Sequence, residues 1–369
     1  MIIFEANLKD MLQYRNIPNN FALALLFMLL WLVVFSGPKA SDEFRGSQAL
    51  RVVFYNVENL FDTFNDSLTR DDEFTPQGMR AWNYNRFIKK CQDLGKVLMA
   101  AGGWEAPGII GLCEVENRFV LNQLLKQSAL GRLDYRIIHH DSPDPRGIDV
   151  TLLYRPEKFF LLHSEPIAVI FPGESPRGTR DILYVKGLAL DADTIHFFVN
   201  HWPSRFGGYM ATKPLREFTG ALLRTRVDSI FVFDPDANIL IMGDFNDEPN
   251  EYSLEFSLGA KLDRNNLQPG ELYNLMSNLF GDPTKGTQKF RENWSTIDQF
   301  VTSQSLLNGE RGLQIHEQGA VIFDADFLLE DDPVYTGKRL NRTYIGMQYH
   351  GGYSDHLPIK VDIVRVAEW

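Results

Sequence analysis

The sequence predicts an α/β fold in which two packed, mixed and largely antiparallel β-sheets are flanked by helices. Apolar, strand-like segments occur in two blocks, separated by an amphipathic stretch. In the first block, five strand candidates follow one another between Tyr135 and Trp202, with little room for helices. Adjacent strands with short connections pair antiparallel, and mixed strands in two blocks suggest two packed sheets. With helices on the outer faces, the result is a four-layer α/β sandwich.

Hydrophobic periodicity assigns the individual elements. Helical spacing marks residues 80–101, 119–130 and about 214–230. Two stretches rich in Gly, Asp, Arg and Tyr, 268–294 and 323–352, read as long loops, which tend to be functional. The predicted strands are RVVFYNV (51–57), IIGLC (109–113), YRIIHH, DVTLLYR, FFLLHSEPIAVI, ILYVKGLAL, IHFFVNHW, NILIMGDFN, IDQFVTSQSLL and PIKVDIVRV.

The N-terminal region carries a targeting signal. Phe21–Phe35 is uncharged and is followed by SGPKAS, whose small residues suit cleavage. Its 15 residues fall short of the ~20 that span a bilayer and match a signal peptide better. We therefore predict a signal peptide or N-terminal anchor at 1–40, a linker at 41–50 and one catalytic domain at 51–369. The protein is expected outside the cytoplasm, as a periplasmic, secreted or membrane-anchored chain.

Composition narrows the class of protein. With 369 residues, 44% of them hydrophobic, the chain can bury a large core and is globular. A net charge of −11 argues against a broad basic face for nucleic acid, although bound cations and local arginines still permit a nuclease. Cys91 and Cys113 lie in no metal-type spacing and are predicted to be free, buried thiols.

Polar side chains gather where predicted strands end. A carboxylate such as Glu114, at the end of a buried strand, is costly unless it binds a cation or a partner. Asp244 and Asn246 are two residues apart, so both point to one side of an extended backbone. Each motif alone also fits a turn cap. Together, their hard oxygen ligands favour Mg²⁺, with Mn²⁺ as the substitute. The full set comprises Asn56, Glu114, Asp244, Asn246, Asp355 and His356.

Six motifs in a fixed order resemble the endonuclease/exonuclease/phosphatase superfamily of deoxyribonuclease-like, metal-dependent phosphoesterases. They are FYNVEN, GLCEVEN, VNHWPSR, MGDFNDEP, STIDQF and YSDHLPI, spread from Arg51 to Val366. The resemblance implies the deoxyribonuclease-like sandwich and a role for each matching residue. It implies that Glu114, Asn56 and Asp355 hold the metal, that Asn56 also contacts the phosphate, that Asp244 and Asn246 position water and phosphate, that His201 faces the phosphate, and that Asp298 pairs with His356.

Three further residues carry narrower hypotheses. By analogy with the Asp298–His356 pair, Asp149 could orient His201 as an alternative to capping its strand. Arg205 follows the His201 strand and is a candidate phosphate contact. Trp294 could stack on a substrate or simply pack.

These features predict an exported, Mg²⁺-dependent phosphoesterase that cleaves phosphodiester bonds, with a nuclease on nucleic acid or nucleotides as the leading interpretation. A phosphatase or phosphodiesterase for small or lipid-linked phosphoesters is the alternative, and an inactive binding module is a third. The expected partner is the phosphoester substrate, DNA or RNA among the candidates. No protein partner is evident, and only the N-terminal segment is expected to contact a membrane.

Overall fold

The computed structural model describes residues 49–173 and 178–366, and these residues belong to one compact unit. The predicted signal peptide or anchor at 1–40 lies outside the described residues. Among the helices of the described ranges, none combines the length and the apolar character needed to cross a membrane.

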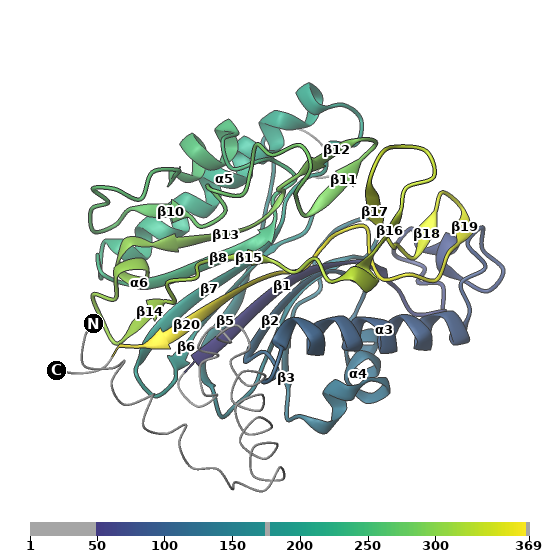
Figure 1. Ribbon diagram of the computed structural model, residues 1–369, viewed down its shortest axis with the longest axis horizontal. Coiled ribbons are helices and arrows are strands. Elements are labelled where there is room, and N and C mark those ends of the chain that lie inside the picture. The colour runs from purple at the N-terminus through teal and green to yellow at the C-terminus, as the bar shows by residue number, and fades with distance from the viewer. Residues whose placement is uncertain (1–48, 174–177, 367–369) are drawn as a thin grey trace, which may run out of the picture. The chain divides into compact units, whose positions relative to one another are not determined.

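Two seven-stranded sheets make up the centre of this unit (Figure 1). The first sheet runs in the order β14 (Leu313–Ile315), β20 (Ile359–Arg365), β1 (Ala49–Leu60), β2 (Ile109–Val115), β4 (Asp149–Tyr154) and β3 (Arg136–His139), with β15 (Val321–Ile322) also paired to β20. The second runs β5 (Phe159–Ile167), β6 (Ile182–Ala189), β7 (Asp193–His201), β8 (Asn238–Asp244), β13 (Asp298–Ser303), β10 (Leu272–Asn274) and β9 (Ala260–Lys261).

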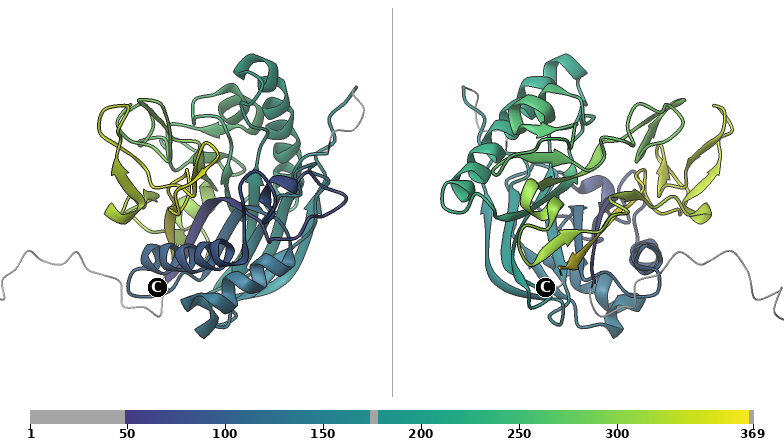
Figure 2. Two further views of the ribbon diagram at one scale, coloured as in Figure 1. Left: turned by 90° about the vertical axis from the view of Figure 1, so that its right-hand side faces the viewer. Right: turned by 60° about the vertical axis from the view of Figure 1, so that its left-hand side comes forward.

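Helices cover the outer faces of both sheets, as Figures 1 and 2 show. The helices α3 (Tyr84–Gly102) and α4 (Arg118–Gln127) lie on the first sheet, and α5 (Tyr209–Phe231) lies on the second. The predicted four-layer order is therefore the observed one. The remaining helical segments of the described residues are α6 (Gln304–Asn308), a π-helix η4 (Ser253–Leu258), and the 3₁₀ turns η2 (Asp72–Phe74), η3 (Ala129–Arg132) and η5 (Asp326–Leu328).

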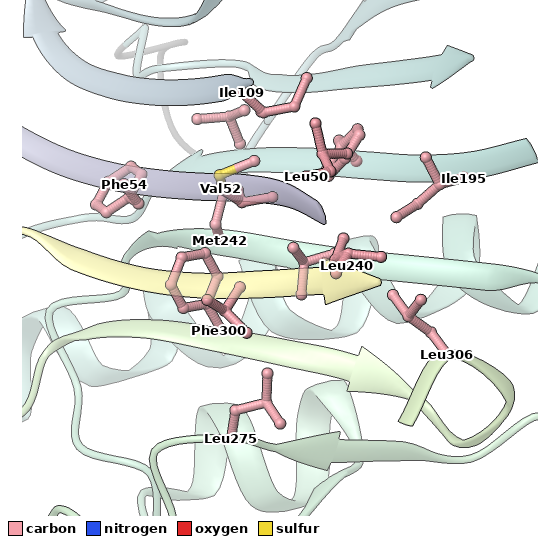
Figure 3. Close-up of a cluster of buried hydrophobic side chains, with 14 of the residues drawn as sticks. Leu50, Val52, Phe54, Ile109, Ile195, Leu240, Met242, Leu275, Phe300 and Leu306 are labelled. Atoms are coloured by element: carbon pink, nitrogen blue, oxygen red, sulfur yellow. The ribbon is translucent and has the colours of Figure 1, made fainter. Parts of the chain in front are cut away.

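The strand β1 is apolar on both faces because each face meets a different layer. Leu50, Val52 and Phe54 belong to the core between the sheets, where Figure 3 shows them against Met242 of the second sheet. The alternate residues of β1 belong to the cluster beneath α3 and α4. A strand whose alternating side chains are buried on both faces has a continuous apolar sequence.

The parallel pairs set the position of the functional edge. β1 runs parallel to β2, and β7 runs parallel to β8. The carboxyl ends of the two strands in each pair therefore lie together at one edge of their sheet. Three short hairpins, which occupy the two predicted long loops, lie at the right-hand end of the sheets in Figure 1. They are β11 (Gln288–Phe290) with β12 (Asn293–Ser295), β16 (Leu329–Asp331) with β17 (Lys338–Leu340), and β18 (Tyr344–Ile345) with β19 (Gln348–Tyr349).

Most element boundaries agree with the prediction, and the exceptions have local causes. β1 begins at Ala49, inside the predicted linker, because Ala49 and Leu50 pair with the end of β20. α5 begins at Tyr209, before the expected start at Pro214, after a loop that contains Gly207 and Gly208 with positive φ angles of 90° and 116°. The proline thus lies inside the helix.

A buried ion pair joins α5 to the loops that follow β7 and β8. Arg216 is fully buried, and its Nε lies 2.7 Å from Oδ1 of Asp247. The second oxygen of Asp247 accepts a hydrogen bond of 2.6 Å from Ser253. Arg216 also donates to Thr212 through Nη1 at 2.9 Å. Because a buried charge that loses its partner is strongly destabilising, this pair fixes the loops relative to the helix.

Replacing Arg216 by Met should lower the free energy of unfolding by about 3 kcal/mol or more, since Asp247 stays buried without its partner. The double variant Arg216→Met/Asp247→Asn should recover part of that loss. Urea unfolding measures both, and Arg224→Met, on the same helix but partly exposed, is the matched control. A loss no larger than that of Arg224→Met would contradict the role assigned to the pair.

His196 on β7 is a buried histidine away from the functional edge. Its side chain packs in the second sheet, with Nδ1 2.8 Å from the hydroxyl of Tyr184. Burial, followed by repulsion from Lys186, lowers the pKa of His196 to about 4. The unfolded chain therefore binds a proton at His196 before the folded chain does, and the protein loses stability as the pH falls from the ordinary histidine pKa through about 4.

Between pH 7 and pH 4, the wild type should lose up to about 3 kcal/mol more stability than His196→Gln, which cannot be protonated there. Urea unfolding at the two pH values measures this difference. His163→Gln, at an exposed histidine on β5, is the control. If His196→Gln loses as much stability as the wild type, the buried histidine is not a source of acid sensitivity.

Candidate active site

The polar residues of the centre lie on the same face of their strands as the apolar residues that fill the core between the sheets. On β1, Val52 and Phe54 face the core between the sheets, and Asn56 is the next residue in the same series. Because side chains alternate between the two faces of a strand, a polar side chain follows the apolar ones on the inner face of each strand. In the second sheet the corresponding residues are Asp244 after Met242, His201 after Val199, and Asp298 before Phe300.

Asp244 is the central carboxylate and is only 2% exposed. Its Oδ2 accepts a hydrogen bond of 3.0 Å from Asn56, and its Oδ1 accepts one of 3.0 Å from the backbone of Asn246. The Nε2 atoms of His201 and His356 lie 3.7 Å and 3.8 Å from Oδ2. Burial raises the pKa of Asp244 to about 7, against the attraction of His356.

Asp298 and His356 form a buried pair. The Nδ1 atom of His356 lies 2.7 Å from Oδ2 of Asp298. This contact fixes the ring, so that Nε2 faces Asp244 and Asn56. Burial alone would lower the pKa of His356, but the carboxylates of Asp298 and Asp244 outweigh it and raise that pKa well above its ordinary value.

His201 is held through its backbone. Arg180 donates to the carbonyl oxygens of His201 and Trp202 at 3.2 Å and 2.6 Å, and it pairs with Asp144 at 3.0 Å. Burial and then the charge of Arg180 lower the pKa of His201 well below its ordinary value. A neutral imidazole donates through one nitrogen only. Its Nε2 lies 3.9 Å from Oε1 of Glu114, on the side of the centre.

Glu114 reaches the centre through an unusual backbone conformation. Simple alternation on β2 would turn this side chain toward α3 and α4. Its φ angle of 63° and a register shift of the ladder between Cys113 and Val115 change that direction. Oε2 then accepts a hydrogen bond of 2.9 Å from the backbone of Asn59, and Oε1 lies 3.5 Å from Nδ2 of Asn56. Left-handed backbone at a residue other than glycine costs about 1–3 kcal/mol and gathers at functional sites.

Asn246 and Arg205 brace the loop between β8 and η4. Asn246 has a φ angle of 53°, and its Nδ2 donates to the carbonyl of Trp202 at 3.1 Å. Arg205 donates to the carbonyl of Asn246 at 2.8 Å, and its side chain is 38% exposed. Within the structure Arg205 therefore positions the loop.

The expected orientation of His201 by Asp149 is wrong. Oδ2 of Asp149 lies 3.0 Å from Nε2 of His139, and Oδ1 accepts a hydrogen bond of 2.8 Å from the backbone of Ser142. Nδ1 of His201 has no hydrogen-bond partner among the described residues. The reason is topological, since Asp149 begins β4 in the first sheet, beside β3 and the loop that follows it, whereas His201 ends β7 in the second sheet.

Asp355 and Trp294 lie at the margin of the centre. Asp355 accepts a hydrogen bond of 2.9 Å from Arg342. Burial would raise the pKa of Asp355, but Arg342 and then His356 hold it below its ordinary range. Trp294 is half-buried on β12 and packs against the apolar cluster beneath α3 and α4, so its observed contacts are those of a packing residue.

The donor set fits a hard divalent cation. One ligand atom each from Asp244, Asp298 and His356 lies within 4.8 Å of the others. Oδ1 of Asp298 is buried and has no hydrogen-bond partner in the described part of the chain, so it remains free to bind. Glu114 and Asn56 contribute further oxygen atoms at the same edge. Carboxylate and amide oxygens with a single imidazole favour Mg²⁺ or Mn²⁺ over zinc.

Several residues that shape the centre were not found from the sequence. Arg216 and Arg342 lie in segments that read as ordinary helix or loop, and only their ion-pair partners identify them. Glu58 was overlooked, although it stands two residues after Asn56 in FYNVEN. An acidic residue two positions after Asn56 could have been predicted from the sequence as part of the site.

Known proteins are similar to this chain in sequence pattern or in fold. Residues 51–365 match the model of the endonuclease/exonuclease/phosphatase family. No curated protein sequence matches the chain. Among solved structures, the human Nocturnin catalytic domain is similar with a TM-score of 0.54 and 18% identity, covering 86% of this chain and 95% of that one.

Two further structures extend the comparison. TDP2 from Caenorhabditis elegans is similar with a TM-score of 0.51 and 15% identity, covering 94% of this chain and 88% of that one. A Bacteroides thetaiotaomicron mannosyl-6-phosphatase gives a TM-score of 0.51 and 16% identity, covering 85% of this chain and 99% of that one. At these identities the likeness concerns the fold, which is the predicted deoxyribonuclease-like sandwich. The match over residues 51–365 shows that this chain belongs to the endonuclease/exonuclease/phosphatase family of phosphoesterases.

Proposed function

We propose that the chain is an exported, Mg²⁺-dependent phosphoesterase that hydrolyses phosphodiester bonds, as a nuclease on nucleic acid or nucleotides. One observation supports this most strongly. Asn56 on β1 and His356, just before β20, come from the first sheet, and Asp244 and Asp298 come from the second. The four side chains converge in one buried, hydrogen-bonded cluster. Phosphoester hydrolysis needs such a preorganised set, because it is catalysed mainly by positioning and by charge stabilisation.

The residues of the centre can serve the different parts of the reaction, and some of them serve two. Asp244 and His356 are the two groups placed to exchange a proton with the attacking water. The raised pKa of His356 favours its protonated form, which leaves Asp244 as the acceptor. Asp298 holds the ring of His356, and Asn56 and Asn246 can donate to phosphate oxygens. Glu114, Asn56, Asp244 and Asp298 would hold the cation, with Asp355 beside them. A bound Mg²⁺ supplies Lewis-acid neutralisation of the charge on the phosphate.

Two features bear on the substrate and the location. The net charge of −11 favours a small phosphoester, such as a sugar, inositol or lipid head-group phosphate, as the second candidate. The partly exposed Arg205 beside the centre favours the nucleic-acid interpretation. Export rests on the apolar segment Phe21–Phe35, which has the length of a signal-peptide core.

Removing divalent cations from the full-length protein should abolish hydrolysis of bis-p-nitrophenyl phosphate, and Mg²⁺ should restore it. Asp244→Ala and His356→Ala should each lower kcat about 100-fold or more, because each removes a proton-transfer and positioning group. Asp263→Ala and His163→Ala, at exposed positions, are the matched controls. Full activity of either site variant, or activity in chelator equal to that in Mg²⁺, would overturn the assignment of the centre.

A parallel assay on plasmid DNA, RNA, bis-p-nitrophenyl phosphate and p-nitrophenyl phosphate decides between the two substrate classes. We expect cleavage of the diester and nicking of the plasmid. Activity on the monoester alone would reject the nuclease and support the phosphatase.

A further inference from the structure

A cavity lies beside the catalytic centre. Its volume is about 270 Å³, and its lining includes Arg80, Arg342, Asn59, Thr343, Phe74 and Tyr344. We call it the arginine pocket. In Figure 1 the hairpin β18–β19 lies beside the chain segment that leads into α3, and the bond from the hydroxyl of Tyr344 to the carbonyl of Arg80, at 3.0 Å, joins the two.

Covalent and hydrogen-bonded neighbours place the arginine pocket next to the centre. The backbone of Asn59, which lines the pocket, donates to Oε2 of Glu114 at 2.9 Å. Arg342 donates to Asp355 at 2.9 Å, and Asp355 precedes His356 in the chain. The arginine pocket is therefore lined by residues that are hydrogen-bonded to Glu114 and Asp355, two residues of the predicted metal site.

Arg80 is held with its plane fixed. Its guanidinium carbon lies 4.9 Å from the ring centroids of both Phe74 and Tyr344, and its Nε lies 3.0 Å from a carboxylate oxygen of Glu73. Nη1 makes a long contact of 3.4 Å with the carbonyl of Gly346. Nη2 has no hydrogen-bond partner within residues 49–173 and 178–366. Arginine stacked on aromatic rings presents its edge donors in a rigid fork.

Arg342 provides the second guanidinium. Its Nε and Nη2 donate to Oε1 of Glu58 at 2.9 Å and 2.7 Å, while Nη1 makes no hydrogen bond in the described part of the protein. Oε2 of Glu58 accepts a hydrogen bond of 2.9 Å from the backbone of Thr343. Both oxygens of this buried carboxylate are thus already bonded. The pocket keeps unused donors from two arginines, whereas its acidic group is satisfied.

We propose that the arginine pocket binds a second phosphate of the substrate, next to the one that is hydrolysed. The proposal rests on the phosphoesterase function of the neighbouring centre. Guanidinium groups with free, fixed donors match pairs of oxygen atoms on a phosphate, and such charge-assisted bonds are among the strongest in proteins. A ligand with two phosphates should therefore bind better than its analogue with one.

Calorimetry with thymidine 3′,5′-bisphosphate and thymidine 5′-monophosphate, in Mg²⁺, tests the proposal without turnover. The wild type should bind the bisphosphate about tenfold or more tightly than the monophosphate. Arg80→Gln should lose most of this preference, and Arg80→Lys should retain part of it because the charge remains. Arg224→Gln, on α5, is the matched control and should keep the full preference. Thermal unfolding of each variant shows that it is folded.

Equal affinities for the two nucleotides in the wild type, or an undiminished preference in Arg80→Gln, would overturn the proposal. If inorganic phosphate alone binds as tightly as the bisphosphate and depends on Arg80, the pocket serves free phosphate and the assignment to substrate fails. Hydrolysis of bis-p-nitrophenyl phosphate is measured in parallel. If the protein hydrolyses the diester but shows no preference for the bisphosphate, only the proposed phosphate site in the arginine pocket is rejected. If it shows the preference but no hydrolysis, the phosphate site is supported and the proposed phosphoesterase function is rejected.

Discussion

The contact between Asn56 and Asp244 is the constraint on which the centre depends. It joins the inner faces of two sheets through a buried hydrogen bond of 3.0 Å. The position of either side chain follows from the apolar residues before it, since each is the next inward-facing residue of its strand. Packing of the core between the sheets therefore determines the geometry of the site, and a shift of either sheet would separate the two groups.

The buried carboxylates of the centre require positively charged partners for electrostatic reasons. Asp244 and Asp298 are both buried and close together, which is unfavourable for two ionised carboxylates. His356 lies between them and its pKa is raised by both. A divalent cation would relieve the same repulsion, and the free oxygen of Asp298 is available to it. The Arg342–Glu58 pair balances charge on the neighbouring side.

The sequence predicted the two-sheet sandwich and most of the centre because both depend on local pattern. Apolar runs defined the strands, polar residues at strand ends marked Asn56 and Asp244, and the resemblance to the family added Asp298. The features that escaped prediction depend on tertiary contacts. The backbone turn at Glu114 arises from an irregular ladder, and the partners of Asp149 follow from which sheet its strand joins. The roles of Arg180 and Arg216 became visible only through their burial.

The central claim is that these residues form one site for a divalent cation at the meeting edge of the two sheets. Titration of Mn²⁺ into chelator-treated protein, followed by electron paramagnetic resonance, tests it directly. The account predicts that the wild type binds Mn²⁺ and that Glu114→Gln binds it at least about tenfold more weakly. Equal binding by the two proteins, or no bound Mn²⁺ in the wild type, would contradict the account.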